Sequence, residues 1–157
     1  MNLTEHRRFL AAQGYLELGM ESDALVELDK LEEPFRSHPD AGRLRVQILL
    51  QAERWRECVE ICKELWDGTS ATAAMRLHGA YCLHELKRTE EARDLLLSAG
   101  DFLGTDPTFH YNLACYAAVL GDSAETRDRL AAAFDLDPDL IEMSKTDPDL
   151  DSVRNLI

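Results

Sequence analysis

A register of 34 residues constrains the fold of this chain more than any other feature of its sequence. One column of the register contains Ala24, Cys58, Ala92 and Thr126, and a second contains Ala12, Val46, Ala80 and Ala114. Two further columns contain Tyr15, Leu49, Leu83 and Ala117, and Leu28, Cys62, Leu96 and Leu130. This spacing is typical of stacked helical hairpins, in which small residues let backbones approach and Leu fills the space between hairpins. Because one hairpin alone would leave an apolar face in water, the register predicts an all-α array of four hairpins.

Residues that cap helix N-termini delimit these hairpins independently of the register. Candidate caps are Thr4, Ser22, Thr89, Asp106 before Pro107, and Asp122 with Glu125 three residues later. We predict first helices over 5–18, 40–52, 72–86 and 107–120, and second helices over 22–35, 55–67, 89–103 and 123–136. After Pro138 the register stops, and we expect a short helical turn followed by a helix from Pro148 to about Leu156. This segment would cover the open apolar face of the fourth hairpin.

The segment from Pro107 to Pro138 resembles the tetratricopeptide repeat. The matching stretches are Tyr111-Asn-Leu-Ala-Cys-Tyr116, Leu120-Gly-Asp122 and Ala133-Phe-Asp-Leu-Asp-Pro138. In the second and third units, Glu53 and Lys87 replace the turn glycine present at Gly19 and Gly121. The resemblance implies a right-handed α-α superhelix in a single domain, 1–157, with repeats near 5–38, 39–72, 73–106 and 107–138 and a cap at 139–157. Asp-Pro-Asp-Leu, at 137–140 and 147–150, resembles the segment that often closes bacterial arrays of this family and suggests a bacterial source.

The charge balance limits the classes of partner. The chain has 30 acidic and 17 basic residues, a formal net charge of −13, which opposes binding to nucleic acid or to anionic membranes. It favours a neutral or basic protein partner over an acidic one. Residues 1–10 contain no apolar segment of signal-peptide length, and no apolar run approaches 18 residues. With four cysteines in the sequence, two of them on packing columns, we expect a cytoplasmic, reducing location.

The residues that could support catalysis or metal binding lack the required spacing. Asp135, Asp137 and Asp139 alternate as in a calcium loop, but Leu140 and Thr146 occupy the positions that need Gly and Glu. Cys58 and Cys62 lie four residues apart on one helix face, yet both belong to packing columns. His78, Cys82, His84 and Cys115 follow no known ligand or nucleophile pattern. We therefore predict no catalytic residue, no metal site and no cofactor.

The family resemblance implies that the first helix of each hairpin lines a concave groove. The register assigns to this groove Phe9, Gln13, Arg43, Gln47, Leu77, Tyr81, His84, Tyr111, Asn112 and Cys115. Aromatic groups there would supply contact area, while Gln, Asn and Arg would hydrogen-bond an extended backbone. The alternative for Phe9, Leu77, Tyr81 and Tyr111 is a place in the core. Some family members hold acidic C-termini with a clamp of Lys, Arg and Asn. In this set only Arg43 and Asn112 are of a suitable type, and this shortage disfavours acidic C-termini as ligands.

These observations predict a non-catalytic interaction module that binds a peptide or partner segment. A first alternative is a self-assembling scaffold, in which the uncovered first hairpin, with Phe9, Leu10 and Leu16, packs against a second copy. Secretion chaperones built of a few such repeats have a similar length and form a second alternative. A metal-dependent protein or an enzyme is a third and weaker one.

Overall fold

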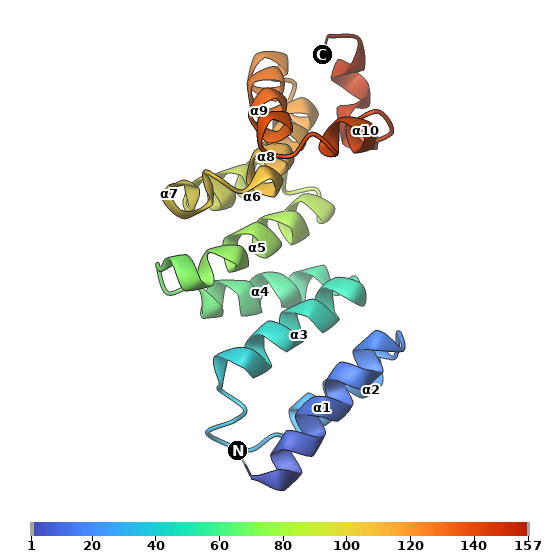
Figure 1. Ribbon diagram of the computed structural model, residues 1–157, viewed down its shortest axis with the longest axis vertical. Helices are drawn as coiled ribbons and strands as arrows, with labels where there is room; N and C mark the ends of the chain where they lie inside the picture. Colours follow the sequence, from blue (N-terminus) through green and yellow to red (C-terminus); the bar gives the residue numbers. More distant parts are fainter. Residues whose placement is uncertain (1, 157) are drawn as a thin grey trace. The chain divides into compact units, whose positions relative to one another are not determined.

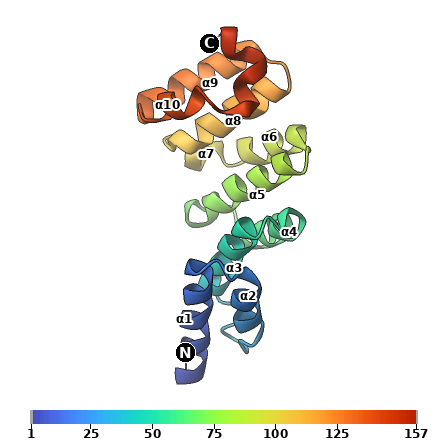
Figure 2. The same ribbon diagram turned by 90° about the vertical axis from the view of Figure 1, so that its right-hand side faces the viewer.

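The computed structural model describes residues 2–156, and all regular elements in this range are helical. Contacts divide the chain into two compact units, Met1–Leu65 and Trp66–Ile157, each built of antiparallel helices (Figures 1 and 2). The predicted all-α class is confirmed. The assignment of 1–157 to a single domain stays a prediction. None of the described helices is long and apolar enough to span a membrane.

Unit 1 contains two helical hairpins. Its helices are α1 (Leu3–Glu17), α2 (Glu21–Asp29), α3 (Pro39–Gln51) and α4 (Trp55–Leu65). The side chain of Asn2, rather than Thr4, caps α1, because its Oδ1 accepts the Glu5 backbone N–H at 2.9 Å. The prediction that the second helix runs to residue 35 is wrong. In a helix that continued to Pro34, the proline ring would clash with the Lys30 carbonyl and would offer it no N–H donor, and α2 ends at Asp29.

Unit 2 contains two further hairpins and the C-terminal segment. Its elements are η1 (Ser70–Thr72), α5 (Ala73–Glu85), α6 (Thr89–Leu97), α7 (Gly100–Leu103), α8 (Pro107–Val119), α9 (Ser123–Leu136), α10 (Leu140–Ser144) and the 3-10 helix η2 (Pro148–Leu156). Asp106 and Asp122 cap α8 and α9 as predicted. The predicted helix 89–103 is interrupted, because the Ser98 hydroxyl donates to the Leu95 carbonyl and Gly100, a poor helix former, follows.

The core of each unit follows the register. The columns Ala24, Cys58, Ala92, Thr126 and Ala12, Val46, Ala80, Ala114 are all at most 1% exposed. Thr126 fits a position where the other three members are Ala or Cys because its hydroxyl donates to the Asp122 carbonyl at 2.7 Å. Cys58 and Cys62 are buried with their sulfurs 4.0 Å apart, so both thiols pack as small apolar groups.

The four hairpin turns share one backbone conformation. The turn residues Gly19 and Gly121 have φ values of 69° and 86°, and Glu53 and Lys87 have 55° and 62°. This left-handed region is open to Gly but strained for residues with a Cβ. The 34-residue register therefore extends to the turns, and the second and third hairpins form despite a local steric cost.

Candidate partner-binding surface

The first-helix face of unit 1 combines half-buried and exposed side chains. Phe9 and Gln13 on α1 are half-buried, while Arg43 and Gln47 on α3 are exposed. Phe9 lines a small cavity of about 150 Å³ together with Phe35 and the start of α3. The guanidinium of Arg43 pairs with Asp40 at 2.5 Å, at a surface position where such a pair contributes little. This face therefore offers one aromatic wall and polar groups open to solvent.

The first-helix face of unit 2 is different, because the chain itself covers much of it. Leu77 and Asn112 are half-buried and Tyr81 is 41% exposed. His84, Tyr111 and Cys115 are each at most 5% exposed, since η2 packs on α8 (Figure 2). The expectation that these three residues line an open groove is therefore not met. For Tyr111 the core alternative describes the observed position.

Two aspartates attach η2 to this face. The Tyr111 hydroxyl donates to Asp147 Oδ2 at 2.8 Å, and the Cys115 thiol lies 3.7 Å from the same oxygen. His84 Nε2 lies 2.8 Å from Asp149 Oδ2, while its Nδ1 is 3.0 Å from the Thr89 hydroxyl. Each side chain of this cluster, which comprises His84, Thr89, Tyr111, Cys115, Asp147 and Asp149, has a hydrogen-bond partner within it.

The Cys115 thiol and the Tyr111 hydroxyl act as hydrogen-bond donors in this cluster. Burial raises the pKa of the Cys115 thiol, and the nearby Asp147 carboxylate raises it further. Burial and the hydrogen bond to Asp147 likewise raise the pKa of Tyr111. Both groups therefore stay protonated and donate. Ligand atoms of Cys115, Asp147 and Asp149 lie within 4.8 Å of one another, and the Cys115 thiol donates to Asp147 in this arrangement.

Apolar contacts complete the attachment of η2. Leu150 is fully buried and Val153 is 4% exposed, and the Ser152 hydroxyl donates to the Ala118 carbonyl of α8 at 3.3 Å. We expected apolar residues of the C-terminal segment to cover the open face of the fourth hairpin. Leu150 and Val153 are buried, whereas Ile141, Met143 and Leu156 are 45%, 48% and 56% exposed. The sequence pattern does not predict that the segment lies on the first-helix face. The sequence does contain a signal for this position, because Asp147 and Asp149 are hydrogen-bond acceptors suited to Tyr111 of α8 and His84 of α5.

Comparisons with known proteins identify the fold. No protein-family model and no curated protein matches the sequence. Among solved structures, the MamA RS-1 double mutant has a TM-score of 0.77 at 15% identity, with 99% of this chain and 92% of that chain covered. MamA MSR-1 has a TM-score of 0.72 at 15% identity, covering 85% and 76%. YrrB, described as a tetratricopeptide repeat protein with an unusual peptide-binding site, also has a TM-score of 0.72 at 15% identity, with 87% of this chain and 71% of that chain covered.

These similarities agree with the 34-residue register, the buried small columns and the left-handed hairpin turns. At this level of identity they establish the fold. The chain has the fold of the tetratricopeptide repeat proteins.

Proposed function

We propose that this chain is a non-catalytic protein-binding module, and that the α1–α3 face of unit 1 holds an extended segment of a partner protein. The observation that carries the proposal is the occupied face of unit 2, where a chain segment lies against α8 through Tyr111 and Cys115. Two repeats earlier in the register, these positions are Arg43 and Gln47 on α3. Both side chains are exposed and carry hydrogen-bond donors that an extended backbone can use.

The chemistry of the whole chain supports a partner that is neutral or basic. A net charge of −13 attracts such a partner and repels nucleic acid. We place this binding in the cytoplasm, in keeping with four buried cysteines. Leu77, Tyr81 and Asn112 of unit 2 remain candidates for additional contacts, because η2 leaves them half-buried or exposed.

Site-specific photo-crosslinking tests this proposal. A benzophenone amino acid replaces Gln47 in one variant and Asp23, an exposed residue of α2, in a matched control. We expect position 47 to give adducts with one partner segment in the native cell, which mass spectrometry identifies. A synthetic peptide of that segment should bind the unmodified chain, and Arg43→Ala with Gln47→Ala should weaken it about tenfold. Identical adducts from both positions, or an unchanged affinity, would contradict the proposal.

Self-association is a second candidate function, favoured by the outer side of α1. Leu3, Leu10 and Leu18 are 66%, 50% and 74% exposed, and Leu3 and Leu10, seven residues apart, share one helix face. Light scattering should then report a dimer at high protein concentration and a monomer for Leu3→Glu with Leu10→Glu. A monomer of the unmodified chain at all concentrations would exclude this function.

A further inference from the structure

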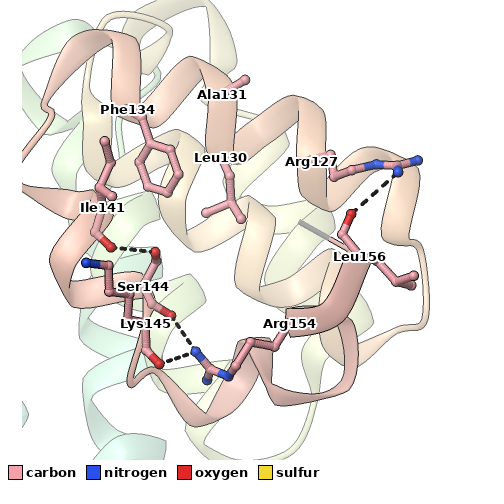
Figure 3. A pocket seen from close by; sticks show the side chains of 9 residues that line it. All are labelled: Arg127, Leu130, Ala131, Phe134, Ile141, Ser144, Lys145, Arg154 and Leu156. Carbon is pink, nitrogen blue, oxygen red and sulfur yellow. Dashed lines mark hydrogen bonds between the residues drawn. The ribbon is translucent and has the colours of Figure 1, made fainter.

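We propose that unit 2 carries a second binding site, for a small aliphatic carboxylate, between α9 and the C-terminal segment. A cavity of about 450 Å³ lies here (Figure 3). Its volume is within the range of about 300 to 1,000 Å³ typical of small-molecule sites. The site goes beyond protein binding and does not depend on it.

The walls of this cavity are mainly aliphatic and aromatic. They are formed by Leu130, Ala131 and Phe134 of α9, by Ile141 of α10, and by Leu156 of η2. Ile141 and Leu156 remain 45% and 56% exposed, so apolar surface next to the cavity is left in water. An aliphatic ligand would cover it, and each additional methylene that fits should raise the affinity roughly fourfold.

The charged residues at the cavity are all basic. Of the four Lys and Arg residues that follow Pro107, three line it, namely Arg127, Lys145 and Arg154. The same stretch contains ten Asp and Glu residues, and none of them is among the lining residues. The lining itself therefore contains no carboxylate that would repel an anionic ligand.

Arg127 is the cation best placed to receive the ligand's carboxylate. Lys145 pairs with Glu142 at 2.6 Å, and Arg154 pairs with Asp151 at 2.5 Å. Within residues 2–156, Arg127 forms no ion pair. Its guanidinium donates one long hydrogen bond of 3.5 Å to the Leu156 carbonyl at the edge of the cavity (Figure 3). A guanidinium in this state can bind a carboxylate with two hydrogen bonds.

The backbone around the cavity favours a free small molecule over an extended peptide. The Ile141 carbonyl accepts the Ser144 hydroxyl at 2.8 Å, and Arg154 donates to the carbonyls of Ser144 and Lys145. These acceptors are therefore already used, as the dashed lines of Figure 3 show. An extended peptide would find few backbone partners here, whereas an aliphatic chain needs none.

Titration of the full chain with octanoate tests the proposal, with the methyl signals of Leu130 and Ile141 followed by NMR. We expect saturable shifts of both signals below ~1 mM octanoate, with hexanoate weaker and decanoate tighter. Octanol, which lacks the charge, should bind about tenfold more weakly. Absence of saturable shifts, or equal affinity for octanoate and octanol, would overturn the proposal.

Two variants and a control locate the site. Arg127→Gln should weaken octanoate about tenfold and leave octanol unchanged, while Ile141→Glu should abolish octanoate binding because it places a like charge in the wall. Arg93→Gln, the same change on α6 outside the cavity, should bind like the unmodified chain. Circular dichroism checks that each variant folds. Undiminished octanoate binding by folded Arg127→Gln, or by folded Ile141→Glu, would refute the assignment.

Discussion

The hydroxyl of Tyr111 donates a 2.8 Å hydrogen bond to Oδ2 of Asp147, a residue 36 positions later in the chain. This bond joins the first-helix face of α8 to the segment that leads into η2. The same carboxylate also accepts the backbone N–H of Asp149 through Oδ1 at 3.0 Å. One side chain thus fixes both the position of the segment and its local turn.

Asp147→Ala should release η2 from α8. Removal of this acceptor leaves the buried Tyr111 hydroxyl and Cys115 thiol without their partner, which should lower the free energy of unfolding by about 1–3 kcal/mol. Urea denaturation measures the loss, and hydrogen exchange should show faster exchange over 147–156. Asp137→Ala is the matched control, because Asp137 occupies the same place in the first Asp-Pro-Asp-Leu sequence and accepts the Asp139 backbone N–H at 3.1 Å in an equivalent local turn. Equal effects of both substitutions would show that the cluster does not anchor the segment.

Stability should fall in alkaline solution because of Cys115. Burial raises the pKa of its thiol in the folded protein, whereas the unfolded thiol titrates near its usual value of about 8.5. The stabilising contribution is therefore complete below about pH 8.5 and is lost as pH rises above it, by up to about 1.4 kcal/mol per pH unit. Urea unfolding between pH 7 and 10 measures this slope. Cys115→Ala should make it shallower, and an unchanged slope would show that Cys115 does not cause the loss.

Glycine at the non-glycine turns should stabilise the chain. Glu53→Gly and Lys87→Gly remove a Cβ from residues with φ of 55° and 62°, and each should raise the free energy of unfolding by about 0.5–1 kcal/mol. Thermal and urea denaturation provide the measurement. Glu60→Gly, within α4, should instead destabilise by about 1 kcal/mol. Destabilisation by the two turn substitutions would mean that their side chains contribute more than the strain costs.

A larger residue in a small column should disrupt packing between helices. Ala114 is fully buried, so Ala114→Leu should lower the free energy of unfolding by about 1–3 kcal/mol. Ala124→Leu, on the exposed side of α9, is the control and should remain within about 0.5 kcal/mol. If both variants unfold at the same urea concentration as the unmodified chain, the small column does not limit helix approach.

The parts of the fold that depend on local or periodic signals could be predicted from the sequence. The start of α8 is predictable because Asp106 caps it with a hydrogen bond to the backbone N–H of Thr108, only two residues away. The small columns are predictable because small residues recur in each column every 34 residues. The end of α2 was missed although Pro34 is a local signal. The left-handed turns at Glu53 and Lys87 are also predictable from the sequence, because both residues align with turn glycines in the register.

The surface was harder to predict than the core. A register gives the side of a helix on which a residue lies, but it does not reveal what another part of the chain places there. Gln47 and Tyr81 are exposed as a groove requires, while His84 and Tyr111 are buried by contacts with Asp149 and Asp147. Those contacts join residues 65 and 36 positions apart, and no local pattern encodes them. The cavity beside Arg127 likewise depends on how α10 and η2 meet α9.

Through its attachment to α8, η2 occupies the side of unit 2 that contains His84 and Tyr111, and it would compete with any peptide for that side. A tethered segment acts at an effective concentration in the millimolar range, so a free peptide must exceed that level, or bind far more tightly, to displace it. Weak ligands are thereby excluded from the His84 and Tyr111 side of unit 2. Under the proposed function, a weak peptide would therefore bind the α1–α3 face of unit 1 in preference to this side of unit 2, even with identical contacts at both.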